Sequence, residues 1–199
     1  AADTVTITIT AANDAPIVAS AISDASTAED AAYSLDASGT CTDADASDTM
    51  VYSISGGPST ITTTDAGVIS GTPVNADVDT YTITVTCTDA AGSAATDSYE
   101  LTVTNTNDAP TYSSADNAPD ISEGSTAVET ITVSDVDASE SFTCSLGGND
   151  AGSFSCTVTG SNVALAFSTA PDYDIAGDAD ANNDYLVTLT INDGDDDGS

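Results

Sequence analysis

The sequence predicts an all-β protein made of two tandem Greek-key β-sandwiches, and three observations support this. Apolar residues alternate with Thr and Ser at a period of two in several segments, which is typical of strands with one buried face. No segment shows the i, i+3, i+4 spacing of an amphipathic helix. Clusters of Asp, Gly, Asn and Ser interrupt the segments at short intervals, as the turns of a sandwich do.

The alternating segments, taken in chain order, give the candidate strands. In residues 3–10, Val5, Ile7 and Ile9 share one face and Thr occupies the other. The same pattern recurs later in the chain. The inward residues there are Tyr81, Ile83, Val85 and Cys87, then Leu101 and Val103, and finally Tyr185, Val187, Leu189 and Ile191. Many of these residues are β-branched or aromatic, which suits a pleated, half-buried surface.

A repeat underlies the strands. Asn-Asp-Ala-Pro occurs at residues 13–16 and again 94 residues later at 107–110, each time after an alternating segment. Each Pro lacks an N–H donor and holds the residue before it extended, so we interpret both motifs as interdomain linkers. Residues 185–199 joined to residues 1–16 reproduce the strand, acidic turn, strand and linker of residues 81–110.

The predicted domains follow from this repeat. Residues 1–12 form an orphan last strand, residues 13–107 the first sandwich, and residues 108–199 a second sandwich without its final strand. Either the chain is one period of a longer tandem repeat, or residues 3–10 complete the second domain of another copy by β-strand addition. Both interpretations predict a linear head-to-tail array of copies. The remaining alternative is a monomer whose ends do not match the domain boundaries and whose residues 1–10 are mobile.

Composition excludes several classes of function. The chain has 33 Asp and Glu and no Lys, Arg or His, giving a formal charge of −33. It therefore has no basic surface for nucleic acid or an anionic membrane, no Ser-His-Asp nucleophile, and no P-loop or Schiff-base lysine. No apolar run reaches the ~18–20 residues of a membrane-spanning helix. Carboxylate, amide and hydroxyl oxygens remain, and these are the ligands of Ca²⁺.

Acidic residues gather where the predicted strands end. Asp43, Asp89 and Asp193 each continue the inward register of a strand at the same end of a domain. Like charges brought together in this way repel one another unless a cation lies among them. The full candidate set comprises Asn13, Asp14, Glu29, Asp43, Asp45, Asp89, Asn107, Asp108, Glu123, Asp135, Asp137, Asp172, Asp174 and Asp193.

These motifs resemble a known family. The second half resembles a cadherin repeat. It has, in family order, Glu123, the D-x-D at 135–137, the G-G-N at 147–149, a D-Y-D at 172–174 in place of L-D-x-E, and the D-G at 193–194. The first half resembles the dystroglycan-type cadherin-like domains of large microbial surface proteins. Its motifs are A-E-D at 28–30, D-A-D at 43–45, S-G-T-P-V-N-A-D-V at 70–78 and the closing N-T-N-D-A-P.

The resemblance implies Ca²⁺ bound between successive domains. The central junction would use Glu29, Asn107, Asp108, Asp135, Asp137 and Asp193, with Asp77 as a further candidate. The junction between copies would use Glu123, Asp172, Asp174, Asn13, Asp14, Asp43, Asp45 and Asp89. The second set holds seven carboxylates, enough for two or three ions that each take ~6–8 oxygens. The first half lacks the D-x-E motif, so we expect fewer ions at the central junction.

A competing interpretation is that Asp is simply common in turns. We apply it to the segment 178–184 and to the run 195–197, which we expect to be solvated loops.

The four cysteines fit the same strand map. With no C-x-x-C and no His, they indicate structural disulfides and an oxidising, extracellular setting. Cys41 and Cys87 lie on strands expected in opposite sheets, whereas Cys144 and Cys156 share the registers of other core residues. We predict the pairs 41–87 and 144–156, one of three connectivities, the alternative being buried free thiols.

The function predicted from these features is a structural one. We expect an extracellular filament or stalk of cadherin-like domains, joined to copies of itself and stiffened by Ca²⁺, with no membrane insertion. The alternative is the repeat region of an adhesin that binds a cell-surface glycan or protein, although the chain has no Trp for an aromatic platform. Paired carboxylates could also serve glycoside hydrolysis. No acid lies in an apolar setting that would raise its pKa, so we predict that the protein is not an enzyme.

Overall fold

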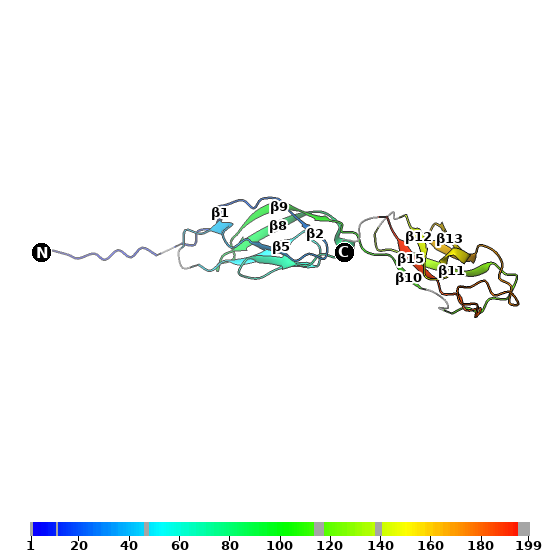
Figure 1. Cartoon of the computed structure of the whole chain (residues 1–199). Coiled ribbons are helices and arrows are strands. Elements are labelled where there is room, and N and C mark those ends of the chain that lie inside the picture. The colour runs from blue at the N-terminus through cyan, green and yellow to red at the C-terminus, as the bar shows by residue number, and fades with distance from the viewer. Residues whose placement is uncertain (1, 11, 46–47, 114–117, 138–140, 195–199) are drawn as a thin grey trace. The chain divides into compact units, whose positions relative to one another are not determined.

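The computed structural model describes residues 2–10, 12–45, 48–113, 118–137 and 141–194. The chain divides into two compact units, Ala1–Thr106 and Asn107–Ser199, and Figure 1 labels some of the strands in each. Strands and two short 3-10 turns form the regular structure, and the described residues contain no α-helix. The predicted all-β class is confirmed. None of the described helical turns is long and apolar enough to cross a membrane.

The first unit contains the strands β1 to β9. They are β1 (Ile17–Val18), β2 (Ala25–Ala28), β3 (Tyr33–Asp36), β4 (Cys41–Thr42), β5 (Val51–Ser55), β6 (Ile61–Thr63), β7 (Val68–Gly71), β8 (Asp79–Thr88) and β9 (Ala94–Thr104), with a 3-10 turn at Asn75–Asp77. The largest sheet has the order β2-β9-β8-β5, a second has the order β3-β7-β6, and β1 pairs with β4. Strand β2 runs parallel to β9, whereas β8 is antiparallel to both of its neighbours.

Alternation along β8 and β9 builds the core of this unit. Ile83, Val85 and Cys87 on β8 are fully buried, as is Leu101 on β9. Between them, Thr side chains face outward, and the two strands pair along the whole length of β8. The predicted inward faces of both segments are confirmed, because a period of two places every second side chain on the same face of a sheet.

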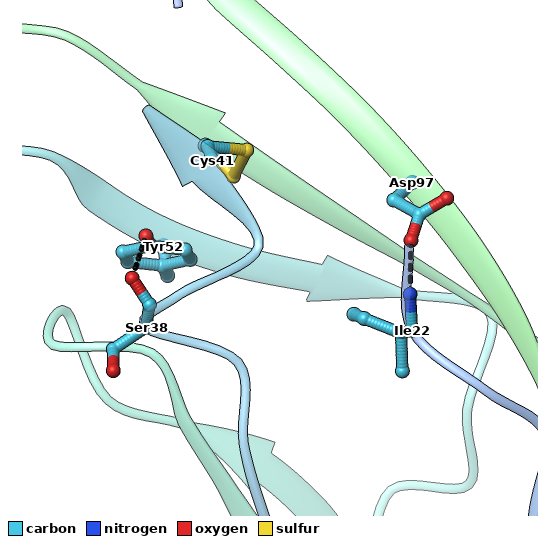
Figure 2. The surroundings of a disulfide bond; sticks show 6 residues. Ile22, Ser38, Cys41, Tyr52 and Asp97 are labelled. Carbon is cyan, nitrogen blue, oxygen red and sulfur yellow. Dashed lines mark hydrogen bonds between the residues drawn. A yellow bond between two sulfur atoms is a disulfide. The ribbon is translucent and has the colours of Figure 1, made fainter. Parts of the chain in front are cut away.

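The first disulfide joins two sheets across this core. Cys41 on β4 is bonded to Cys87 on β8, as predicted. Figure 2 shows its surroundings, where the Tyr52 hydroxyl donates a 2.6 Å hydrogen bond to the carbonyl oxygen of Ser38. The backbone N–H of Ile22 donates to the Asp97 carboxylate, also at 2.6 Å. These contacts fix the loops on either side of the bridge.

The second unit contains the strands β10 to β15. They are β10 (Thr111–Ser113), β11 (Ala127–Ser134), β12 (Thr143–Gly147), β13 (Phe154–Thr159), β14 (Asn162–Phe167) and β15 (Thr188–Asn192), with a 3-10 turn at Ala151–Ser153. Four strands form a sheet in the order β10-β11-β14-β13, and β12 pairs with β15. The predicted bridge between Cys144 and Cys156 is present and joins β12 to β13, so it also connects the two sheets.

Two predicted strands differ from the structure. Residues 3–10 pair with no described strand, and Val5, Ile7 and Ile9 are 78%, 83% and 92% exposed. The last alternating segment becomes a strand only at Thr188, although Tyr185 and Val187 still pack against the core. Strand β12 pairs with β15 only from Thr188 onward. Before it, the N–H of Asp150 donates to the carbonyl oxygen of Leu186, outside the ladder.

Candidate metal centre

The linker end of the first unit gathers acidic side chains from separate elements. We use this name for Asn13, Asp14, Asp43, Asp45, Asp48 and Asp89. Asp43 follows β4 and Asp89 follows β8, and the disulfide between these strands holds the two positions together. One carboxylate oxygen each of Asp43, Asp48 and Asp89 lies within 4.8 Å of the other two. These three carboxylates are close enough to hold one metal ion.

Hydrogen bonds order this end. The Asn13 amide donates to Asp89 Oδ2 at 2.9 Å, and the backbone N–H of Asp14 donates to Asp45 Oδ2 at 2.8 Å. In turn, the N–H of Asp45 donates to Asp43 Oδ1 at 2.8 Å. The linker residues are thereby tied to the turn after β4 and to the residue after β8.

Asp89 is held in its charged form. It is 5% exposed, and Ser93 donates its N–H to Oδ1 at 2.7 Å. The hydrogen bond from the Asn13 amide lowers the pKa of Asp89; burial acts in the opposite direction, and backbone N–H donors from the following turn lower the pKa further. A carboxylate that remains ionised while buried is suited to bind a cation.

The second unit repeats this geometry at its own linker end, formed by Asn107, Asp108, Asp135, Asp137 and Asp193. The Asn107 amide donates to Asp193 Oδ2 at 3.2 Å. The N–H of Asp108 donates to Asp137 Oδ2 at 2.7 Å, and the N–H of Asp137 donates to Asp135 Oδ1 at 2.9 Å. Asp137 and Asp193 are 7% and 2% exposed. Both units therefore build the same set of three hydrogen bonds from the same residue types.

Three buried carboxylate oxygens have no hydrogen-bond partner among the described residues. They are Asp43 Oδ2, Asp135 Oδ2 and Glu29 Oε2. Asp43 and Asp135 occupy the same position in the two linker ends, so the feature recurs. A buried oxygen left without a partner costs about 1–3 kcal/mol, and more when it is charged. The chain has no Lys, Arg or His to neutralise these oxygens, and an all-oxygen donor set suits Ca²⁺.

The opposite end of each unit carries a glutamate. In the first unit, Glu29 is 2% exposed and its Oε1 accepts the N–H of Thr106 at 3.0 Å. In the second, Glu123 is exposed and its Oε2 accepts the N–H of Tyr173 at 3.2 Å. Glu123, Asp172 and Asp174 line a common hollow. We call these regions the glutamate ends. Because β8 is ten residues long, the two ends of the first unit are about 30 Å apart.

The first unit lacks the second unit's paired aspartates at its glutamate end. The backbone N–H of Asp30 donates to the carbonyl of Pro73, and Gly124 does the same to Pro171 in the second unit. The residue after Pro73 is Val74, whereas Pro171 is followed by Asp172. Asp77, our further candidate, accepts hydrogen bonds from the Thr60 hydroxyl at 2.6 Å and the Val74 N–H at 3.1 Å. It caps a turn.

The structure therefore brings together the predicted ligands of each half-site. Asn13, Asp14, Asp43, Asp45 and Asp89 meet in the first unit, whereas Asn107, Asp108, Asp135, Asp137 and Asp193 meet in the second. Sequence reasoning missed Asp48, which is the third acid in the run D-A-D-A-S-D at 43–48. The predicted junctions each combine residues of two units, and their assembly remains a proposal.

One loop was predicted incompletely. Most of segment 178–184 is exposed, as expected, but Asp178 is only 9% exposed. It accepts the backbone N–H groups of Asn182 and Asn183. Asp150, which is 6% exposed, accepts those of Ala179 and Leu186. These two carboxylates organise the loop by satisfying backbone donors. The run 195–197 lies outside the described residues.

Comparison with known proteins agrees with this architecture. Residues 15–104 match the family model described as "Putative Ig domain". No curated protein matches the sequence. Among solved structures, cadherin domains 3–6 of protocadherin gamma B2 superpose with a TM-score of 0.55 at 18% identity, covering 88% of this chain and 42% of that one. The corresponding domains of protocadherin gamma B7 give 0.53 at 22% identity, covering 86% and 41%.

Domains 1–4 of a third protocadherin, gamma B3, give 0.54 at 21% identity, covering 80% and 42%. The chain thus spans about two fifths of the length of these cadherin structures. The likeness establishes the fold: the protein consists of tandem cadherin-like β-sandwiches with acidic clusters at the ends of the domains.

Proposed function

We propose that this protein is a structural segment of an extracellular filament or stalk, in which Ca²⁺ holds successive cadherin-like sandwiches at a fixed angle. The observation that carries the proposal is the pair of partnerless buried oxygens, Asp43 Oδ2 and Asp135 Oδ2, at equivalent positions in a chain that has no cationic side chain. Without a cation each oxygen is a buried charge that lacks compensation. With Ca²⁺ bound, the same oxygens become ligands.

In this proposal each junction joins a glutamate end to a linker end. Glu29 of the first unit would complete the linker end of the second unit. Glu123, Asp172 and Asp174 would complete the linker end of the first unit in the next copy. Without the ion these groups repel one another, so neighbouring domains separate and bend. With the ion bound, the shared ligands fix one angle between them.

The setting fits an exposed structural polymer. Both cysteine pairs are oxidised in the structure, which is typical of proteins outside the cytosol. The large negative charge that remains after ion binding would keep neighbouring fibres apart and hydrated. We also propose the finer assignment to repeats of large microbial surface or filament proteins, which is supported by the sequence motifs of the first half that resemble dystroglycan-type cadherin-like domains.

The test is a comparison of the purified protein in Ca²⁺ and in EGTA. Ligand at a hundred times its Kd stabilises the folded state by about 2.7 kcal/mol, and 1 kcal/mol shifts the melting temperature of a domain of this size by about 4–8 °C. We expect Ca²⁺ to raise the melting temperature by 10 °C or more on this basis. Small-angle scattering should show a longer, narrower particle in Ca²⁺.

Two variants locate the effect. Asp43→Asn and Asp135→Asn each keep the side-chain shape and remove one ligand charge, so each should reduce the Ca²⁺-dependent gain. Glu100→Gln is the matched control, because Glu100 is exposed on β9 and pairs with Thr82, six residues before the linker end of β8 at Thr88. If Ca²⁺ changes neither the melting temperature nor the scattering profile of the wild-type protein, the proposal is wrong.

A further inference from the structure

We infer that residues 3–10 of one copy insert as a strand into the second unit of another copy, between β15 and residues 119–122, whether the copies are separate molecules or successive periods of a longer chain. The inference rests on the proposed function only in assuming that copies are arranged head to tail. It does not require a bound metal ion. Three comparisons between the two units support it, and each uses contacts within a single unit.

The first comparison concerns the edge of the sheet. In the first unit β9 lies between β8 and β2, pairing antiparallel with one and parallel with the other. In the second unit β15 corresponds to β8, since both pair in the same register with the equivalent strands β12 and β5. Residues 119–122 correspond to β2 by the repeat. No described strand lies between them. The strand β2 pairs only with β9, so without an equivalent of β9 the residues 119–122 have no strand to pair with, and they form none.

The second comparison concerns burial on the same face. Ile83 and Val85 are completely buried beside β9. Their counterparts in the second unit, Val187 and Leu189, remain partly exposed. The two faces carry similar apolar residues, and no strand among the described residues covers the second one beside β15. An apolar face and an open strand edge together form a site for strand addition.

The third comparison identifies the occupant. When the Asn-Asp-Ala-Pro motifs are aligned, Val5, Ile7 and Ile9 fall on Tyr99, Leu101 and Val103 of β9. Those three residues of β9 are 2%, 0% and 2% exposed. The equivalent residues 5, 7 and 9 are among the most exposed apolar side chains of the described chain. Figure 1 shows this segment as an extended trace leading away from the sandwich of the first unit.

The pairs seen in the first unit define the register. Tyr81 pairs with Leu101 and Ile83 with Tyr99, which places Ile7 opposite Tyr185 and Val5 opposite Val187. After the strand, the N–H of Ala12 would reach Glu123, as the N–H of Thr106 reaches Glu29 in the first unit. Insertion would therefore bring Asn13 and Asp14 to the glutamate end of the neighbouring copy.

Crosslinking tests both the partner and the register. The outward positions Thr6 and Leu186 should face each other, as Glu100 and Thr82 do in the first unit. A Thr6→Cys, Leu186→Cys variant should give a ladder of covalent oligomers on a non-reducing gel. A Thr4→Cys, Leu186→Cys variant, two residues out of register, should give at least tenfold less. A crosslinked band at monomer mass, or equal yields from both variants, would overturn the inference.

Substitution on the inward face supplies an independent test. Ile7→Asp should weaken assembly at least tenfold in sedimentation, whereas Thr6→Asp on the outward face should leave it nearly unchanged. Unaltered assembly of Ile7→Asp would refute strand exchange, as would a wild-type chain that remains monomeric at high concentration.

The crosslinking is carried out in Ca²⁺ and in EGTA, so that the two proposals can fail separately. A crosslink that persists in EGTA, without any effect of Ca²⁺ on the melting temperature, would support strand exchange and refute the proposed Ca²⁺ site. A Ca²⁺-dependent melting temperature without the crosslink would do the reverse.

Discussion

The two disulfides should contribute unequally to stability, and the structure indicates by how much. The bridge between Cys41 and Cys87 spans 46 residues, whereas the bridge between Cys144 and Cys156 spans 12. In the chain-entropy description a crosslink stabilises the folded state by limiting the unfolded chain, more so for a longer loop. Loops of these lengths give about 4 and about 3 kcal/mol. The longer loop should therefore contribute about 1 kcal/mol more.

Urea unfolding of two double variants measures these contributions. Cys41→Ala, Cys87→Ala should lower the unfolding free energy of the first unit, and Cys144→Ala, Cys156→Ala that of the second. With seven Tyr and no Trp, tyrosine fluorescence and circular dichroism are the suitable probes. Cys87 is fully buried, so its replacement also leaves a small cavity that adds to the loss.

Chemical reduction of the wild-type protein is the control for that cavity, because it opens both bridges without deleting atoms. If the bridge between Cys144 and Cys156 proves the more stabilising of the two, or if reduction leaves the unfolding transitions unchanged, the loop-length argument is wrong.

Two further outcomes follow from individual residues. Burial raises the pKa of Asp178, but hydrogen bonds from Asn182, Asp180 and Asn183 outweigh it and lower the value to about 2. The ionised form of Asp178 therefore stabilises the fold above pH 4, and this contribution should be lost as pH falls from 4 toward 2. The stability difference between wild type and Asp178→Asn should shrink over that range, and a difference that stays constant down to pH 2 would contradict this assignment. A Cβ on Gly71 would clash with the backbone carbonyl oxygen of Thr60, so Gly71→Ala should cost about 1–3 kcal/mol in urea unfolding. Gly39→Ala, whose Cβ meets nothing within 4 Å, should be neutral or slightly stabilising; equal losses would contradict the steric argument.

Much of the fold could be predicted because its signals are local. The period of two along residues 81–87 and 101–103 fixes which side chains face inward, whatever the partner strand. The disulfide pairs followed from the strands that carry the cysteines. The residues at which each strand begins and ends could not be predicted from local sequence, because they depend on pairing with another strand. Tyr185 continues the alternation of β15, yet the strand begins at Thr188, because its ladder with β12 ends at the pair Gly147 and Thr188.

The candidate site shows the same division between local and distant information. The sequence by itself determined that this chain has only oxygen ligands, that acids follow the inward strands, and that the pattern occurs twice. Only the tertiary structure decided what each carboxylate does. Asp77 and Asp178 bind backbone N–H groups, Asp48 joins Asp43 and Asp89, and Asp43 Oδ2 is left buried without a partner. The physical reason is that the role of a carboxylate depends on the donors and acids around it. Some of these are neighbours in sequence, such as Asn182 for Asp178, but others, such as Asp89 beside Asp43, are brought near only by folding.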